Sequence, residues 1–272
     1  MKSTIGSPWH PRLTDPSDSR EVKPRTSGLT MVIDKGLGPH AFQDLLTTSS
    51  GYFDLLKFGF GTSSLYPSPL LREKLAQAKN AGIAAFPGGT LLEAAFRLRV
   101  VPDFFRSVLE LGFDGVEISD GTVHLKRSER DELIREAGLL GLRVFTEYGK
   151  KTHGARLDID DLCRTFERDL NCGAELVTVE ARESGQGVGL FDDDGACRED
   201  ELELVLKRIP DRTKLMWEAP QKDQQAALLR IAGPDVNLGN VQPQEAFALE
   251  TMRRGLRSDT FGLHRVISDY VI

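Results

Sequence analysis

A strand-like run, followed by a glycine-rich or polar turn and then a helical stretch, recurs along almost the whole chain. The eight strand-like runs are Leu29–Lys35, Phe53–Gly59, Ile83–Pro87, Gly115–Ser119, Arg143–Glu147, Leu176–Glu180, Lys214–Glu218 and Val236–Gly239. Their ends are spaced by about 29 residues on average, which is the length that one strand–helix unit needs. Several runs carry consecutive apolar residues and do not alternate with polar ones, as is typical of parallel strands that are covered on both faces.

Eight such units fit within 272 residues, and repeated strand–helix alternation closes naturally into a barrel of about 250 residues. We therefore predict an α/β fold, a (β/α)8 TIM barrel with a single domain. An open doubly wound sheet is the alternative, because the period alone does not prove that the sheet closes. Helices are expected between the strands, among them Pro69–Asn80, Ser128–Ala137, Asp158–Leu170 and Glu199–Ile209.

The start of the chain differs from the rest in composition. Its first 20 residues are rich in Pro, Ser and Asp and lack the apolar stretch of a secretory signal. We expect residues 1–22 to form a flexible N-terminal extension and residues 23–272 to form the barrel, which is the catalytic domain. No run approaches the roughly 18 apolar residues of a membrane helix, so no membrane partner is expected.

Charge and composition exclude several classes of protein. The net charge of −6 argues against nucleic acid as a partner. Cys163, Cys172 and Cys197 form no CxxC pair, which favours a reducing, cytoplasmic setting. The five histidines are scattered without HxxxH spacing, so the sequence does not indicate a zinc site.

Four glutamates lie at or just inside the predicted ends of adjacent strands, where the catalytic groups of such barrels sit. They are Glu117, Glu147, Glu180 and Glu218. Because neighbouring strands are about 4.8 Å apart, carboxylates at matched heights can converge on one hard cation such as Mg²⁺. The alternative is that some of them face outward and form only ion pairs.

Basic residues lie at the same strand ends. The lysines are Lys35, Lys57, Lys150 and Lys151. A partly desolvated lysine beside other cations has a lowered pKa and passes a proton near neutral pH, whereas a charged one binds phosphate, sulfonate or carboxylate. Arg182 adds a potential bidentate anion contact, and its alternative is a salt bridge with Glu183 or Glu180. For each lysine the alternative is an ordinary surface position.

Glycine-rich turns complete the pattern. Gly59–Ser63 and the run Gly88, Gly89 and Thr90 follow strands and precede helices. Backbone N–H groups exposed there, at the start of a helix, bind anions. Neither turn carries the Walker or the dinucleotide fingerprint, so nucleotide binding is not indicated.

Taken in order, these motifs resemble the phosphosulfolactate synthase family over roughly residues 23–261. The matching elements include Lys23-Pro24-Arg25, Asp34-Lys35-Gly36, Lys57-Phe58-Gly59, Gly61-Thr62-Ser63, Pro87-Gly88-Gly89-Thr90, Glu93, Glu117 to Thr122, Glu147, Gly149-Lys150-Lys151, Glu180 to Gly185, Trp217-Glu218-Ala219-Pro220, Asn237 to Asn240, and Leu249 to Thr260.

The resemblance implies a (β/α)8 barrel and a carbon–sulfur lyase reaction, the Mg²⁺-dependent addition of sulfite to C3 of phosphoenolpyruvate. The product is 2-phospho-3-sulfolactate, which feeds coenzyme M biosynthesis in archaea and leads to sulfolactate in some bacteria. Members of the family are oligomers, so a homo-oligomer is expected. In this reaction Mg²⁺ stabilises an enediolate-like species and a lysine protonates C2.

Roles follow from combining the resemblance with the residues. We expect Lys150 as the proton donor, with Lys151 as its nearest rival. The expected substrate-binding residues are Lys35, Lys57, Gly88, Gly89, Thr90 and Arg182. The expected metal ligands are Glu117, Glu147 and Glu180, with Glu218 in reserve.

Two other functions stay open at this point. One is a related barrel enzyme that joins a different nucleophile to phosphoenolpyruvate or a similar phosphorylated acid. Phe60, where the family commonly has Trp, and Tyr148, where a small residue is usual, favour this reading. The other is a non-catalytic, stress-associated member of the family, for which charges at the barrel mouth would be lost, and here they are retained.

Overall fold

The computed structural model describes residues 8–261, and its eight strands form one parallel sheet in the order β3-β2-β1-β8-β7-β6-β5-β4. The strands are β1 Thr30–Asp34, β2 Leu55–Phe58, β3 Ala84–Pro87, β4 Gly115–Ile118, β5 Arg143–Tyr148, β6 Leu176–Val179, β7 Leu215–Glu218 and β8 Asn237–Val241. Because β1 pairs with both β2 and β8, the sheet curls into a barrel. The prediction of a TIM barrel is confirmed, and the open doubly wound sheet is excluded.

The seam of the barrel lies between β3 and β4. The backbone N–H of Asp114 donates to the carbonyl of Ala85 at 2.9 Å, and the carboxylate of Asp114 accepts from the N–H of Ala85 at 2.9 Å. A side chain thus takes over part of the backbone pairing where the two strands meet.

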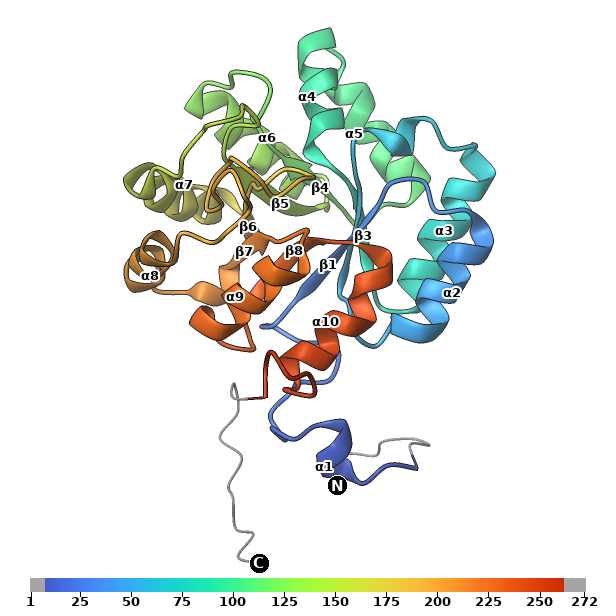
Figure 1. Ribbon diagram of the computed structural model, residues 1–272. Coiled ribbons are helices and arrows are strands. Elements are labelled where there is room, and N and C mark those ends of the chain that lie inside the picture. The colour runs from blue at the N-terminus through green and yellow to red at the C-terminus, as the bar shows by residue number, and fades with distance from the viewer. Residues whose placement is uncertain (1–7, 262–272) are drawn as a thin grey trace, which may run out of the picture.

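Helices cover the outside of the strands (Figure 1). They are α2 Pro39–Ser49, α3 Ser68–Asn80, α4 Gly89–Leu98, α5 Val101–Leu111, α6 Arg127–Leu139, α7 Ile159–Cys172, α8 Glu199–Arg208, α9 Lys222–Ala232 and α10 Ala246–Arg253. The short helix α1 Pro11–Thr14 lies in the N-terminal segment beyond the barrel and buries no side chain. The expected helices are present to within about two residues at each end. None of the described helices is long and apolar enough to cross a membrane.

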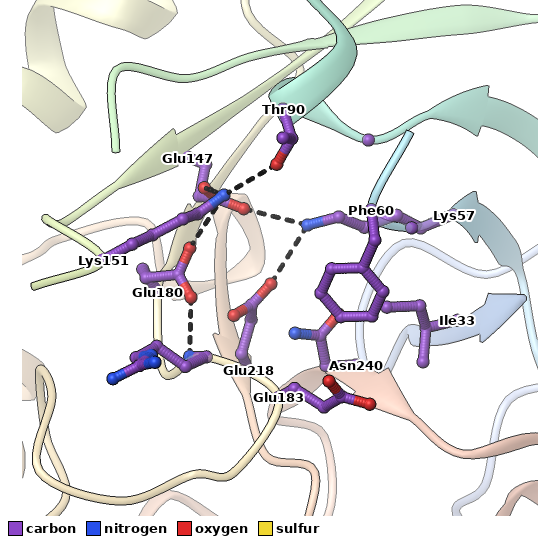
Figure 2. A pocket seen from close by; sticks show the side chains of 13 residues that line it. Ile33, Lys57, Phe60, Thr90, Glu147, Lys151, Glu180, Glu183, Glu218 and Asn240 are labelled. Atoms are coloured by element: carbon purple, nitrogen blue, oxygen red, sulfur yellow. Dashed lines mark hydrogen bonds and ion pairs between the residues drawn. The ribbon is translucent and has the colours of Figure 1, made fainter. Parts of the chain in front are cut away.

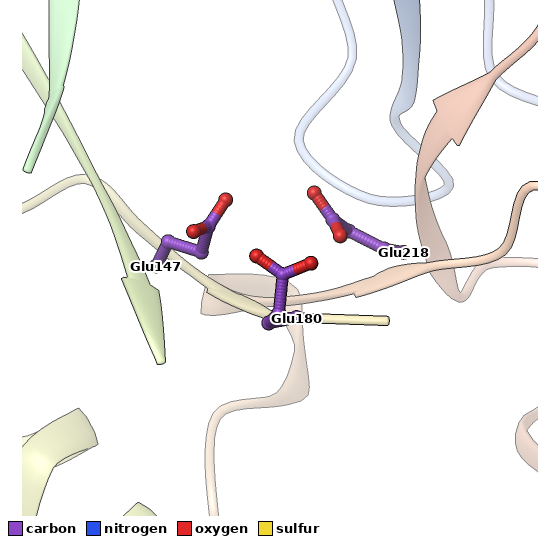
Figure 3. A group of neighbouring side chains, drawn as sticks. All are labelled: Glu147, Glu180 and Glu218. Atoms are coloured by element: carbon purple, nitrogen blue, oxygen red, sulfur yellow. The ribbon is translucent and has the colours of Figure 1, made fainter. Parts of the chain in front are cut away.

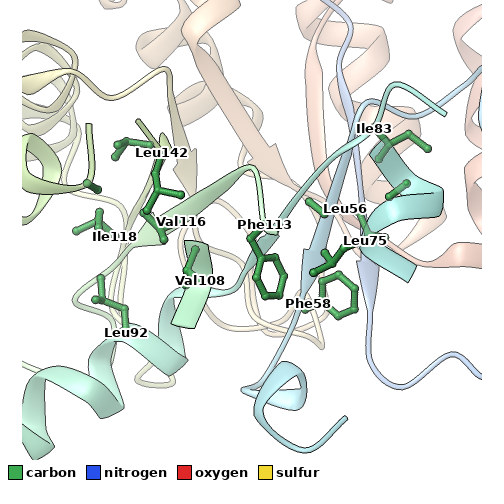
Figure 4. Close-up of a cluster of buried hydrophobic side chains, with 14 of the residues drawn as sticks. Leu56, Phe58, Leu75, Ile83, Leu92, Val108, Phe113, Val116, Ile118 and Leu142 are labelled. Atoms are coloured by element: carbon green, nitrogen blue, oxygen red, sulfur yellow. The ribbon is translucent and has the colours of Figure 1, made fainter. Parts of the chain in front are cut away.

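Successive side chains along each strand point alternately outward and inward, so the apolar ones form one core under the helices and another inside the barrel. Leu56 and Phe58 of β2 face outward and pack under the helices, in the cluster drawn in Figure 4. Leu55 belongs to a smaller cluster inside the barrel, where the rings of Phe86 and Phe145 meet at 4.5 Å. Since side chains alternate with a period of two, Lys57 must face inward, directly above Leu55.

The N-terminal segment is attached to the end of the barrel that precedes the strands. Arg20 is buried and donates to the carboxylate of Glu250 at 3.0 to 3.2 Å and to the carbonyl of Gly28 at 3.0 Å. Arg20, which belongs to the expected extension, therefore packs against the barrel. Residues 1–7 of the expected extension and 262–272 of the expected barrel domain lie outside the described residues.

Candidate active site

A cavity of about 240 Å³ opens at the carboxyl ends of the strands. It is lined by residues from seven of the eight strand ends: Ile33, Lys57, Gly59, Phe60, Gly88, Thr90, Glu147, Lys151, Glu180, Arg182, Glu183, Glu218 and Asn240. Figure 2 shows how Lys57, Lys151 and the glutamates among them point toward one another. The last inward position of several strands carries a charge, which explains why the cavity is ionic although the barrel below it is apolar.

Lys57 is the centre of this ionic cluster. Its Nζ lies 2.9 Å from Glu117 Oε2, 2.9 Å from Glu147 Oε2 and 3.1 Å from Glu218 Oε1. Burial acts to lower the pKa of Lys57, but the surrounding carboxylates outweigh it and hold this pKa well above its ordinary value. Lys57 is therefore a fixed cation that holds carboxylates from three strands together.

Lys151 reaches the same cluster from the loop after β5. Its Nζ lies 3.0 Å from Glu147 Oε1 and 3.4 Å from Glu180 Oε2, and it donates to Thr90 Oγ1 at 3.4 Å. Burial acts to lower the pKa of Lys151, and the attraction of Glu147 and Glu180 outweighs it and raises this pKa. Lys151 thus presents a proton inside the cavity.

Glu147, Glu180 and Glu218 have the geometry to hold a metal ion (Figure 3). All are buried, and one carboxylate oxygen from each lies within 4.8 Å of the others. Glu147 Oε1 and Glu180 Oε2 face Lys151 Nζ at 3.0 and 3.4 Å and make no further hydrogen bond among the described residues, so both can also take part in holding a cation. Oxygen donors of this kind suit a hard divalent cation.

The charge balance also fits a divalent cation. The four carboxylates of Glu117, Glu147, Glu180 and Glu218 face the two ammonium groups of Lys57 and Lys151, which leaves two negative charges (four minus two). Without another cation, protons take up this excess.

The pKa values of two carboxyls show where these protons are held. Burial raises the pKa of Glu117 to about 7 against the opposing attraction of Lys57. Burial and the nearby Glu147 raise the pKa of Glu180 well above its ordinary value. In Glu147 itself burial acts in the same direction, but Lys151 and Lys57 outweigh it and lower the pKa.

Glu117 differs from the other three glutamates. Its Oε2 accepts the N–H of Gly89 at 2.7 Å as well as the contact from Lys57, and it does not belong to the metal-binding group. Of the expected ligands, the structure brings together Glu147, Glu180 and Glu218, the last of which was expected in reserve, and Glu117 lies beside them on Lys57 and Gly89.

The glycine turn after β3 is shaped by close packing. A Cβ on Gly88 would lie 3.2 Å from Lys57 Cε, and one on Gly89 would collide with Ser119 Oγ. Gly88 and Thr90 line the cavity, whereas Gly89 begins α4 and points its N–H at Glu117.

Two of the expected lysines lie away from the cavity lining. Lys150 is half-exposed, and its Nζ binds the carboxylate of Asp120 at 2.7 Å. Lys35 pairs with Glu183 across the mouth at 2.7 Å. Arg182 does line the cavity, and its backbone N–H donates to Glu180 Oε1 at 2.6 Å.

Phe60, Glu183 and Asn240 line the cavity but were not among the expected site residues. Asn240 is buried at the end of β8, and its Oδ1 has no hydrogen-bond partner within the described chain. The sequence could have indicated Asn240 as a site residue, because two asparagines in the short run Asn237 to Asn240 are unusual in a strand. Phe60 is half-exposed at the rim and carried no charge to mark it.

The closed barrel and its ionic mouth define a class, the (β/α)8-barrel enzymes whose site is built from acidic and basic groups at the strand ends. A model of the (2R)-phospho-3-sulfolactate synthase (ComA) family matches residues 18–259. The chain belongs to this family. It is 45% identical to the phosphosulfolactate synthase of Methanothermobacter thermautotrophicus, over 89% of this chain and 95% of that protein.

More distant relatives include a bacterial enzyme and a plant protein. The chain is 37% identical to the phosphosulfolactate synthase of Bacillus subtilis, over 90% of this chain and 96% of that one. It is 26% identical to the protein HEAT-STRESS-ASSOCIATED 32 of Arabidopsis thaliana, over 87% of this chain and 89% of that one.

Solved structures with little sequence identity share the fold. The YdjI aldolase of Escherichia coli K12 aligns with a TM-score of 0.54 at 10% identity, over 88% of this chain and 93% of that one. The 3-hexulose-6-phosphate synthase of Salmonella typhimurium aligns with a TM-score of 0.51 at 14% identity, over 88% and 96%. At this identity the likeness concerns the fold alone.

Proposed function

We propose that this chain is a phosphosulfolactate synthase, a carbon–sulfur lyase that adds sulfite to C3 of phosphoenolpyruvate and yields 2-phospho-3-sulfolactate. The family membership supports this activity, since relatives at 37% to 45% identity over most of the chain bear this name. The observation that carries the proposal is the cluster of buried glutamates with a protonated Lys151 among them, because it can offset charge on one substrate and supply a proton.

The reaction forms two bonds, C3–S and C2–H, and breaks the C2–C3 π bond and one N–H bond of the donor lysine. A lone pair of the sulfite sulfur forms the C3–S bond, the C2–C3 π electrons move toward the carboxylate, and a proton is delivered to C2. Mg²⁺ held by Glu147, Glu180 and Glu218 would supply Lewis-acid stabilisation of the charge that develops on the carboxylate.

We assign the proton delivery to Lys151 and not to Lys150, which the sequence favoured. Lys151 Nζ lies in the cavity beside Thr90, whereas Lys150 Nζ is bound by Asp120 outside the lining. A general acid must be within hydrogen-bond reach of the atom that it protonates, and this favours Lys151.

The remaining expected residues take binding roles in this proposal. Lys57 keeps three carboxylates in place and adds positive charge at the cavity floor. Gly88, Thr90 and Arg182 line the cavity and contact the anionic groups of the substrates, with Gly89 shaping the turn. Lys35, at the mouth, attracts the incoming anions.

The setting of the reaction is part of the proposal. A cytoplasmic homo-oligomer with a catalytic barrel at residues 23–272 fits the family, and its product would enter coenzyme M or sulfolactate metabolism. Light scattering of the purified chain measures the oligomeric state, and a monomer at micromolar concentration would contradict this part.

Purified full-length protein tests the activity. Phosphoenolpyruvate, sulfite and MgCl₂ together should consume the enol absorbance and give a new phosphorus resonance, and omission of any one should stop the reaction. Chelation with EDTA should abolish turnover, and added Mg²⁺ should restore it. Turnover with another nucleophile but not with sulfite would establish the alternative enzyme. Full turnover of the protein in the presence of EDTA would show that the reaction does not need a metal ion.

A further inference from the structure

The stem of Lys151 rests on the loop between β4 and α6. The backbone N–H of Lys151 donates to the carbonyl of Gly121 at 3.2 Å. A Cβ on Gly121 would lie 3.0 Å from both Cγ and Cε of Lys151 and 3.1 Å from its Cδ. Gly121 does not have a left-handed backbone, so the glycine serves to leave space for the lysine stem.

A single buried carboxylate holds this loop. Glu93 of α4 accepts the backbone N–H of Gly121 at 2.9 Å and that of Thr122 at 3.0 Å. It also accepts the hydroxyls of Ser119 and Thr122. The residue is 2% exposed, and no basic side chain of residues 8–261 forms an ion pair with it. Burying a carboxylate without donors is costly. The loop therefore stabilises the buried Glu93 by donating to it, and Glu93 holds the loop in this conformation.

Helix α4 affects the position of Lys151 in two ways, one direct and one through the loop of residues 119–122. Thr90 lies one turn before Glu93, so both side chains lie on the same face of the helix. Thr90 Oγ1 accepts from Lys151 Nζ directly, and Glu93 acts through the loop on which the lysine stem lies. Glu93 does not line the cavity, and within the described residues it forms no hydrogen bond or ion pair with Lys57 or with the metal-binding glutamates.

We propose that Glu93 is a positioning residue: it fixes the loop of residues 119–122, and Gly121 of this loop directs Lys151 Nζ to its place between Glu147, Glu180 and Thr90. The inference rests on the proposed function insofar as Lys151 is the proton donor. If Glu93 served only to join a helix to a loop, its loss would lower stability without changing the chemical step.

Substitutions at Glu93 separate these roles. E93A should lower kcat by about 100-fold, the order of loss expected for a reacting group misplaced by about 1 Å, with little change in KM for phosphoenolpyruvate. E93Q retains one acceptor oxygen and should recover part of kcat. The matched control is E250Q, a buried carboxylate at the opposite end of the barrel, which should lose stability but keep the kcat of the folded protein.

A second variant avoids the risk that E93A does not fold. G121A places a methyl group against the stem of Lys151 and should lower kcat with an unchanged unfolding midpoint. Its control is G51A, where a Cβ meets nothing within 4 Å. Wild-type kcat in G121A would overturn the inference, and so would a kcat in E93A equal to that of E250Q.

A structural readout distinguishes failure of this inference from failure of the proposed function. Crystal structures of the wild type and G121A measure the separation of Lys151 Nζ from Glu147 Oε1, which is 3.0 Å here. An increase in G121A supports the positioning role, and an unchanged separation overturns it whatever the activity. Absence of wild-type turnover with sulfite overturns the proposed function and leaves this measurement valid.

Discussion

The two ends of the barrel both bury charged side chains, but they pair them differently. At the end that precedes the strands, Glu250 accepts from Arg20 with both carboxylate oxygens. Asp54 accepts from Arg25 at 2.8 Å with one oxygen and from the N–H of Thr30 at 2.9 Å with the other. Each of these carboxylate oxygens has a donor, so the charges close the barrel and retain no capacity for a ligand.

The catalytic end shows the opposite pattern. Glu117 Oε1 has no hydrogen-bond partner within the described chain, and Glu147 Oε1 and Glu180 Oε2 are held by Lys151 Nζ alone. Carboxylates outnumber ammonium groups there, and a buried group that lacks a partner is costly. The comparison teaches that buried carboxylates stabilise the fold where every oxygen has a donor, and that the catalytic end gives up stability to keep carboxylate oxygens available for metal and substrate.

The largest expected effect is the loss of the proton donor. K151M should lower kcat by about 10²- to 10⁴-fold, the usual contribution of a positioned general acid, because Lys151 is the proposed proton donor in the cavity. The control K150M should stay within about fivefold of the wild type, since its half-exposed ion pair with Asp120 contributes little. Steady-state kinetics measure both variants. A larger loss in K150M than in K151M would return the role to Lys150.

The next effect concerns stability at the opposite end. E250Q should lower the free energy of unfolding by about 3–5 kcal/mol, because it breaks a buried pair and leaves Arg20 without its carboxylate. Urea titration followed by circular dichroism measures this change. A loss below about 1 kcal/mol would show that these pairs do not close the barrel.

A smaller and opposite effect is expected at the catalytic end of metal-free protein. The pKa of Glu117 rises from its ordinary value of 4.5 to about 7 in the folded state. The folded protein therefore binds this proton more tightly than the unfolded chain, so the carboxyl contributes stability below pH 4.5 that is lost as pH rises through 7.

The substitution E117Q removes this titration. It should stabilise metal-free protein on the order of 2 kcal/mol at pH 8 and hardly at all at pH 5. Thermal unfolding at the two pH values measures the difference. If E117Q instead destabilised the protein at pH 8 as much as E250Q does, buried carboxylates would stabilise the fold equally at both ends of the barrel.

The smallest effect should come from the exposed pair at the mouth. K35M removes the partner of Glu183, and both side chains are substantially exposed, so stability should change by less than about 1 kcal/mol. If Lys35 attracts anionic substrate, KM for phosphoenolpyruvate should rise a few-fold, with a weaker salt dependence, at unchanged kcat. Salt-dependent kinetics measure this effect, and an unchanged KM would limit Lys35 to its ion pair.

Much of the fold and part of the site were predictable from the sequence because local rules govern them. The strand–helix period predicted eight units, and alternation within β2, β5 and β7 places Lys57, Glu147 and Glu218 inside the barrel. Alternation ends where a strand ends. Gly149 has a left-handed backbone just after β5, and Lys150 and Lys151 then point to different places. The sequence therefore did not distinguish the two lysines.

By itself the sequence determined the succession of strands and helices, the apolar layers, and which residue types stand at the strand ends, because these depend on neighbours along the chain. Only the tertiary structure decided which of the side chains at the strand ends contact one another. Lys57 and Glu218 are 161 positions apart, and their side chains lie at 3.1 Å because β1 and β8 pair between β2 and β7 and the sheet curls into a barrel. Charge–charge contact depends on distance in space, and closure of the barrel sets that distance.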